Sequence, residues 1–442
     1  MTNKTTAQFF IKECMTMKRR FFLILLAACL GLTACQGQNL SGDPASTPET
    51  TKPANDPLAT QEPVVNPAES VPAMPEIPEG EGMGLNELDS KLIAYLRENG
   101  LADQSFTVSP LSLKAALALT ALGAEGETQR QILDALGFES VEQMNDWYAS
   151  VLVGVADFDG RIWGSDKNDS AYRVVNAIFH NAACDGEFRE AYKELVAKAL
   201  AAQASSYPAE ELTNAVNQWV NDQTNGMIPS IVEDVHEAAA VLVNALYLKT
   251  KWPEPFMESD LTEFTTASGE KVQKEFITRT EKYRYYEDEN CQLVILPLQG
   301  GINMALILGD GSRLSEKLAN AQTRKVHVSL PKFEVESSFD QKELIYCLRA
   351  MGCDKMFMDS VAEFDPMFTK GIYVDDIIQK AKVKVDEKGL EAAAATAVVM
   401  MRNTALPNPE EPVEFTADHP FQFMIFREDA APELLFWGQI MD

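Results

Sequence analysis

The sequence has few of the residues and motifs on which most enzymes depend. Histidine occurs four times in 442 residues, at His180, His236, His327 and His419, and each stands apart from the others. No HExxH, GxSxG, P-loop or GxGxxG motif is present. A structural role is therefore the simplest interpretation of each histidine. We predict that the chain is not an enzyme and needs no cofactor.

Cysteine is scarce in the body of the chain and lacks metal-ligand spacing. Three of the seven cysteines belong to the first 35 residues, and the others are Cys184, Cys291, Cys347 and Cys353. None of these four belongs to a CxxC pair or has a histidine at ligand spacing. Cys347 and Cys353 lie on opposite faces of any helix that holds both, so they cannot pair locally. We predict buried free thiols and no metal site.

Positive charge is also in short supply. Lys and Arg number 38 against 66 Asp and Glu, which gives a formal net charge of −28. Such a chain repels nucleic acid and anionic membrane surfaces, so we predict no nucleic-acid partner. With 46% hydrophobic residues, it can still bury a substantial core.

No hydrophobic run is long enough to span a membrane comfortably. The run that comes nearest lies close to the N-terminus. After Met17, residues 18–20 are basic and residues 21–32 are apolar, a run too short to span a bilayer comfortably. This arrangement is typical of an export signal. We therefore predict a signal peptide over residues 1–34.

The signal ends in "LTAC", which resembles the bacterial lipobox, and this makes Cys35 the predicted lipidation site. "LAAC", which ends at Cys29, is an alternative with a shorter apolar segment, and a plain secretory signal is another. The resemblance implies an exported protein of bacterial type. It would be held at the cell membrane by its N-terminal lipid, facing the extracellular side or released from it.

Residues 35–84 are rich in Pro, Glu and Thr and poor in large hydrophobic residues, as in "GDPASTPETTKPANDP". Such a segment cannot bury enough surface to offset the entropy of ordering, so we predict a disordered tether. As a flexible coil it would reach roughly 40 Å. Residues 85–442 contain no second linker and no repeat, and are predicted to form a single domain.

Helix signals come first in this domain and strand signals dominate later. Ser109 and Pro110 begin one predicted helix, which Gly123 ends; Thr128 and Gln131 have capping-box spacing before Gly137. A third helix is predicted over residues 215–226. Strands are predicted over residues 240–248, 325–335 and 381–385, with a hairpin of residues 421–426 and 434–440. The fold class is therefore α+β.

Several segments, in the family's order and spacing, resemble signature segments of the serpins, the large serine protease inhibitors. They are "FTVSPLSLKAALALTALGAEGETQRQIL", "VNQWVNDQTNGMI", "NALYLKTKWPEPF", "LPKFEVESSFD", "VDEKGLEAAAAT", "ADHPFQFMIF" and "LLFWGQI". The resemblance implies three β-sheets, eight or nine helices and a reactive loop exposed near the C-terminus. It also implies a suicide substrate, whose cleaved loop traps the protease by becoming a strand of the large sheet. The alternative is a serpin-fold protein that is cleaved, or binds a partner, without trapping a protease.

The predicted loop can be checked for its capacity to become a strand. Residues 389–406 contain no proline, and a central strand tolerates none. If Leu390 points inward, so do the small or apolar residues at alternate positions after it, while Glu391 points outward. A surface helix is the competing interpretation of the alanines. The hinge implied by the resemblance consists of Glu387, Gly389, Leu390, Glu391, Ala392, Ala393, Ala394, Ala395 and Thr396.

This chain departs from the family pattern at two places. Leu390 stands where inhibitory members usually have threonine or serine, and a bulkier side chain must then enter the sheet first. Ser109, Ser112 and Asn244 match the polar cluster, called the shutter, beneath the parting strands, but Gln379 stands where a histidine is common. We expect Gln379 to form a hydrogen bond with Asn244.

The scissile bond follows from counting along the loop. If Glu387 is the seventeenth residue before the cut, the reactive bond joins Asn403 and Thr404. A loop one residue shorter is cut after Arg402, which suits a trypsin-like pocket. Cleavage after Met401 or Val399 suits elastase-like or chymotrypsin-like proteases. The resemblance implies serine proteases as covalent partners, and we expect a monomer.

Overall fold

The computed structural model describes residues 86–442 except 164–168, 340, 391–410 and 429–431. These residues belong to one compact unit, Asn66–Asp442. The predicted signal peptide, Cys35 and the whole of the predicted tether, residues 35–84, lie outside the described residues. Among the residues described, no helix is long and apolar enough to cross a membrane.

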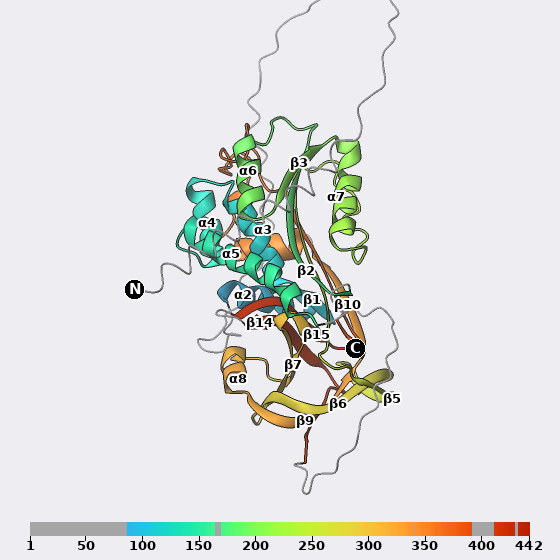
Figure 1. The fold of residues 1–442 in the computed structure, drawn as a ribbon. Helices are drawn as coiled ribbons and strands as arrows, with labels where there is room; N and C mark the ends of the chain where they lie inside the picture. The colour runs from blue at the N-terminus through green and yellow to red at the C-terminus, as the bar shows by residue number, and fades with distance from the viewer. Residues whose placement is uncertain (1–85, 164–168, 340, 391–410, 429–431) are drawn as a thin grey trace, which may run out of the picture. The chain divides into compact units, whose positions relative to one another are not determined.

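The sheet that bears on function is the smaller of the two, a six-stranded sheet (Figure 1). Its strands follow the order β10-β11-β12-β4-β2-β3. Their bounds are β10 Phe333–Phe339, β11 Asp376–Val385, β12 Gly389–Leu390, β4 Ala240–Lys251, β2 Ala171–Asn181 and β3 Gln203–Tyr207. We call it the six-stranded sheet below.

The remaining strands form a nine-stranded network in the order β1-β15-β14-β8-β7-β6-β9-β13, with β5 paired to β6. β6 is long enough to pair with β7 at one end and with β5 at the other. Two of the three expected sheets are therefore joined through β6, and the α+β class is confirmed. The bounds are β1 Phe106–Val108, β5 Met257–Thr265, β6 Lys271–Glu287, β7 Cys291–Pro297, β8 Ile302–Gly309, β9 Gln322–Pro331, β13 Val413–Thr416, β14 Phe421–Glu428 and β15 Pro432–Ile440.

Eight α-helices occur in the described part of the chain. They are α2 Glu87–Leu96, α3 Pro110–Ala121, α4 Gly126–Leu136, α5 Val141–Phe158, α6 Glu190–Ala199, α7 Ala209–Gln223, α8 Leu314–Asn320 and α9 Tyr346–Ala350. Every residue of α3 is buried, which explains why its sequence is apolar on all sides. Ser109 caps this helix by accepting a hydrogen bond from the Ser112 backbone N–H, as predicted.

Two predicted helix starts are wrong. α4 begins at Gly126, so Thr128 lies inside its first turn and forms no capping box with Gln131. The carboxylate of Glu363 instead accepts hydrogen bonds from the backbone N–H groups of Glu127 and Thr128. A residue more than 200 positions away thus supplies the cap, and a local pattern cannot reveal it. α7 begins at Ala209, six residues before the predicted start at residue 215.

The six-stranded sheet is buried on both faces along β4. Leu242, Leu246 and Leu248 face the main core, whereas Val241 and Val243 belong to a second cluster that includes Leu212 and Val216 of α7. This double burial explains the unbroken apolar run of β4. The positions of β4 that face the main core are therefore even-numbered, and the positions that face α7 are odd-numbered.

The four cysteines of the domain are free thiols, as predicted. Cys291, Cys347 and Cys353 are buried, but Cys184 is only half-buried. The four histidines lie in separate parts of the structure, and Nδ1 of His180 contacts the Ser206 hydroxyl at 3.2 Å. Among the residues described, no group of three or more His, Cys, Asp or Glu side chains could hold a metal ion.

Candidate functional site: the opening between β4 and β11

The two central strands of the six-stranded sheet are paired along only part of their length. β4 and β11 run parallel and pair over four positions, from Val241 with Asp376 to Asn244 with Gln379. Beyond these positions β12 lies between them, with Leu390 opposite Val385 on one side and Thr250 on the other. The start of the predicted hinge is therefore already part of the sheet.

Leu390 is seated in the core at this opening. Its side chain is 4% exposed and lines a small cavity together with Leu248, Val383, Ile425 and Phe436. These lining residues come from β4, β11 and β12 of the six-stranded sheet and from β14 and β15 of the nine-stranded network. An apolar residue at position 390 therefore fits this site, although the family usually has a hydroxyl residue there.

Gly389 is required by its close approach to β4. Its φ is +152°, and a Cβ there would collide with the carbonyl oxygen of Thr250 and with Cα of Lys251. A larger residue would push the hinge out of the sheet. The glycine thus permits the turn that brings Leu390 between the two strands.

The residues just before Gly389 are fixed by hydrogen bonds to the loop that follows β4. The backbone N–H of Trp252 donates to the Lys388 carbonyl at 2.9 Å, and its indole donates to the Asp386 carbonyl at 3.0 Å. The backbone N–H of Phe256 donates to the Glu387 carbonyl at 2.8 Å. These bonds anchor the N-terminal end of the predicted reactive loop.

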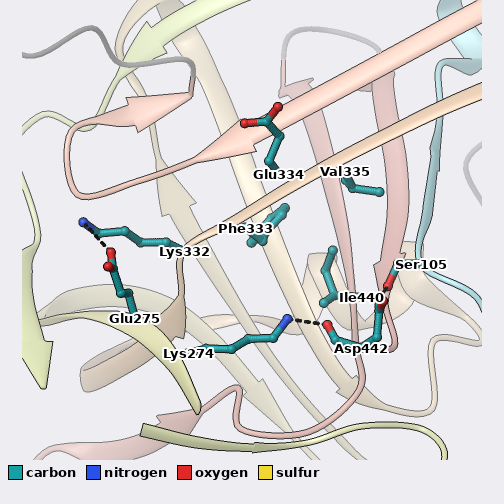
Figure 2. Close-up of a pocket in the computed structure, with 9 residues that line it drawn as sticks. All are labelled: Ser105, Lys274, Glu275, Lys332, Phe333, Glu334, Val335, Ile440 and Asp442. Carbon is teal, nitrogen blue, oxygen red and sulfur yellow. Dashed lines mark hydrogen bonds and ion pairs between the residues drawn. The ribbon is translucent and has the colours of Figure 1, made fainter. Parts of the chain in front are cut away.

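Lys332 adds a charged anchor to the same region (Figure 2). Its ammonium lies 3.0 Å from Glu387, 2.6 Å from Glu258 and 3.5 Å from Glu275. Burial lowers the pKa of Lys332, but its hydrogen bonds to Glu258 and Glu387 outweigh burial and raise that pKa overall. Glu387 therefore connects the hinge to β5 and β6 through one lysine.

Three of the four predicted shutter residues, Ser109, Ser112 and Gln379, are joined by hydrogen bonds, and the fourth, Asn244, is the backbone partner of Gln379. Gln379 accepts a hydrogen bond from the Ser109 N–H at 3.0 Å and donates to the Ser109 carbonyl at 2.9 Å. The Ser109 hydroxyl donates to the Leu435 carbonyl at 2.7 Å and accepts from Ser112 N–H. The shutter thus ties β11 to the start of α3 and to β15.

The expected hydrogen bond between Gln379 and Asn244 does not occur among the hydrogen bonds of the described residues. The two residues are backbone partners, but the amide oxygen and nitrogen of Gln379 each form a hydrogen bond with Ser109 instead. The Asn244 amide nitrogen instead donates to Asn176 of β2, and Asn176 donates to the Tyr148 hydroxyl at 2.6 Å. Asn244 Oδ1 is buried with no hydrogen-bond partner in the described part of the chain.

Asn176 and Tyr148 are shutter neighbours that the sequence analysis missed. Asn176 interrupts the apolar positions of β2, and that interruption was the available signal. Burial raises the pKa of Tyr148 well above its usual range, so the phenol stays neutral and serves as a hydrogen-bond partner. Its place in α5 could not be linked to β2 from the sequence.

Lysines line the face of the opening that is turned away from the main core. Lys249 and Lys251 lie on β4, and Lys380, Lys382 and Lys384 alternate along β11. Lys249 pairs with Asp169 at 2.6 Å, and Lys382 pairs with Glu334 at 2.8 Å. The side chain of Lys384 is nearly half exposed and lies 3.6 Å from Glu334. A strand placed between β4 and β11 would therefore meet cations on this face.

The remaining predicted site residues lie outside the described residues. They are the rest of the hinge, Glu391, Ala392, Ala393, Ala394, Ala395 and Thr396, and the reactive-bond residues Met401, Arg402, Asn403 and Thr404. β13 begins at Val413 and pairs in parallel with β9, so the C-terminal end of the loop is anchored on the nine-stranded network.

The family model described as Serpin (serine protease inhibitor) matches residues 84–442. Human leukocyte elastase inhibitor is 29% identical over 380 residues, which cover 79% of this chain and 95% of that protein. Rat leukocyte elastase inhibitor A is 30% identical over 362 residues, which cover 75% of this chain and 91% of that protein.

Among solved structures, Serpin48 of the insect Tenebrio molitor has a TM-score of 0.65 and 26% identity, covering 79% of this chain and 94% of its own. Tengpin, a thermophilic serpin in its native state, has a TM-score of 0.68 and 24% identity. It covers 79% of this chain and 91% of its own. The similarity to tengpin concerns the fold alone.

Proposed function

Because the chain belongs to the serpin family of serine protease inhibitors, we propose that it traps serine proteases as a suicide substrate. The protease serine attacks the reactive bond and forms an acyl-enzyme with the loop. The cleaved arm, beginning at Glu391, then fills the opening between β4 and β11 before water hydrolyses the ester. The leukocyte elastase inhibitors named above support a serine protease as the target.

The observation that carries this proposal is the position of Leu390 between β4 and β11. Gly389 is opposite Lys251 and Leu390 is opposite Thr250, so the next residues have a defined register if the strand grows. Glu391 would lie opposite Lys249, and Ala394 would lie opposite Leu246. The same register on β11 places Glu391 opposite Lys384.

The charges on the two strands suit this register. Glu391 would point to the outer face, between the ammonium groups of Lys249 and Lys384. Opposite charges directly across neighbouring strands stabilise a sheet by roughly 0.2–1 kcal/mol per pair. Insertion would thus be favoured at its first step.

The same register would also provide a hydrogen-bond partner for Asn244 Oδ1, the buried acceptor in the shutter. Continued along β4 and β11, it places Thr396 opposite both Asn244 and Gln379. Asn244 Oδ1 has no hydrogen-bond partner in the described residues. A hydroxyl donor at Thr396 would satisfy this oxygen and remove the cost of leaving it unpaired.

The test is a denaturing gel of the full-length chain after incubation with leukocyte elastase and with trypsin. We expect a covalent complex that survives SDS with at least one of them. Mass spectrometry of the released C-terminal peptide then identifies the reactive bond: Asn403–Thr404, or a cut after Arg402 or Met401. Complete cleavage without a complex, at every ratio of protease to inhibitor, would instead identify a serpin-fold protein that does not inhibit.

We further propose that the protein is exported and anchored by a lipid on Cys35, and that it is a monomer. The basic residues 18–20, the apolar residues 21–32 and the "LTAC" motif support the anchor. Cys35→Ser should move the protein from the membrane fraction to the soluble fraction in a bacterial host. Cys29→Ser is the control and should leave it in the membrane fraction. The reverse result would move the lipid to Cys29.

A further inference from the structure

β5 is an edge strand that exposes two large apolar side chains. Within the described part of the chain its only strand partner is β6. Met257 is 62% exposed and Leu261 is 63% exposed. Exposed apolar residues on an unpaired edge favour association with other chains, and native proteins usually remove them. Their presence on β5 therefore requires an explanation.

The two ends of β5 are hydrogen-bonded to segments that flank the reactive loop. Just before its first residue, the Phe256 N–H donates to the carbonyl of Glu387, the residue that begins the hinge. At its other end, the Thr265 N–H donates at 2.8 Å to the carbonyl of Asp418, two residues beyond β13. We therefore expect a protease that binds the loop to lie near β5.

The charges of β5 have one sign. The strand "MESDLTEFT" carries Glu258, Asp260 and Glu263 and no base. Glu258 pairs with Lys332 and Glu263 pairs with Lys271. Asp260 is exposed and has no ion pair within the described residues. A partner that covers this edge must therefore bring cationic groups as well as apolar ones.

A hollow beside β5 offers further oxygen acceptors (Figure 2). Lys274 and Glu275 of β6 are the strand partners of Thr262 and Leu261, and they line a cavity of about 430 Å³. Its other walls include Glu334, Asp442 and the apolar Phe333. The Lys274 ammonium is directed to the backbone carbonyl of Asp442. Glu275 and Glu334 already pair with Lys332 and Lys382, but their side chains are still 69% and 46% exposed and can accept further hydrogen bonds. An arginine or lysine laid across Leu261 could end in this cavity.

We propose that the outer edge of β5 is a second contact surface for the target protease. This inference rests on the proposed function, in which the chain inhibits a serine protease. The contact surface binds a protease face that carries cationic and aliphatic side chains beside the active-site cleft. The surface consists of Met257, Asp260 and Leu261. This surface raises the association rate of the target protease with the inhibitor, whereas the loop sequence determines which bond the protease cleaves.

The test measures the second-order rate constant for inhibition of leukocyte elastase by full-length variants. Met257→Ser with Leu261→Ser, and separately Asp260→Lys, should each lower this constant at least tenfold at low salt. The number of inhibitor molecules consumed per protease should not change, because the loop and the opening are unaltered. The effect of Asp260→Lys should shrink at high salt, since screening weakens an exposed charge pair.

Two matched variants serve as controls. Leu195→Ser removes an exposed apolar side chain from α6, and Asp157→Lys makes the same charge change on α5. Both should inhibit at the rate of the unaltered chain. Equal rates for the β5 variants and these controls, within a factor of two, would overturn the proposal.

A second measurement separates this surface from the trapping mechanism. Leukocyte elastase with its catalytic serine replaced by alanine cannot form the acyl-enzyme, so its binding reports non-covalent contacts alone. Weaker binding by the β5 variants supports the surface even if active elastase forms no covalent complex. Equal binding by all variants overturns the surface even if trapping is observed.

Discussion

Three charged residues inside the core link elements that are far apart in sequence. Lys114 of α3 lies 3.2 Å from Asp89 of α2 and 2.6 Å from Glu433 of β15. The Trp147 indole donates to the second oxygen of Glu433 at 2.9 Å. Two carboxylates thus share one ammonium in a buried place. The pKa of Asp89 is raised to about 6 overall. Burial is the largest cause and raises this pKa, the charge of Lys114 lowers it, and the charge of Glu433 raises it.

Asp89→Asn should flatten the pH dependence of stability between about pH 4 and pH 6. The folded pKa of Asp89 is above its ordinary value, so the folded state holds a proton that the unfolded state releases. This contribution is complete below about pH 4 and is lost as the pH rises through 6, by at most about 3 kcal/mol. Denaturant unfolding at several pH values measures it.

Glu87→Gln is the control for this measurement. Glu87 is on the same helix, but it is exposed and pairs with Lys91 at the surface. That variant should keep the pH dependence of the unaltered chain. If Asp89→Asn keeps it as well, another group binds the proton.

Gln379→Ala should destabilise the native protein by about 2–3 kcal/mol. The variant removes two buried hydrogen bonds and leaves the N–H and carbonyl of Ser109 without those partners. Lys380→Ala, the next residue along β11 and half-buried, should change stability by less. The comparison is made by chemical denaturation of the uncleaved chain, and equal losses would show that the Ser109 contacts contribute little.

The sequence was sufficient for the residues whose role depends on near neighbours. Ser109 was recognisable as a cap because Pro110 and an apolar helix follow it directly. The Asp89–Lys114–Glu433 group was not recognisable, because Lys114 is 25 residues from one partner and 319 from the other. Gln379 was placed in the shutter by family resemblance, but its partner was misassigned because an amide fits either neighbour equally well.

At the scale of the elements, the partial strand β12 was beyond the reach of the sequence. The alternation after Gly389 indicated which side chains face inward if a strand forms, and Leu390 is buried as that pattern requires. Nothing in the pattern indicated that two residues already lie between β4 and β11. That position depends on the separation of the two strands, which tertiary packing determines.

Ala394→Glu should convert the protein from an inhibitor to a substrate. The register begun by β12 turns residue 394 inward, opposite Leu246, where an unpaired carboxylate costs several kcal/mol. Ala393→Glu is the matched control, because residue 393 faces outward opposite Lys382 and should still allow trapping. Gels with leukocyte elastase should show cleavage alone for the first variant and a complex for the second. Identical behaviour of both would contradict the register.

At the scale of the whole molecule, cleavage of the loop should raise thermal stability. Among the described residues of the uncleaved chain, only the two of β12 lie between β4 and β11 beyond their paired positions. A fully inserted arm would add backbone hydrogen bonds on both sides, each worth about 1 kcal/mol. We expect the melting temperature to rise by more than about 10 °C. Calorimetry before and after limited proteolysis measures it, and an unchanged melting temperature would exclude insertion.

The four parallel pairs between β4 and β11 give the trap two kinetic stages. Residues 391–395 would meet positions of β4 that β11 has already left, so the arm could advance over them quickly. From Thr396 onward, each residue must displace an existing pair, beginning with Asn244 and Gln379. The race against hydrolysis of the acyl-enzyme would then be decided at the shutter, halfway along the arm, and the hydrogen bonds of Gln379 would set the duration of that pause.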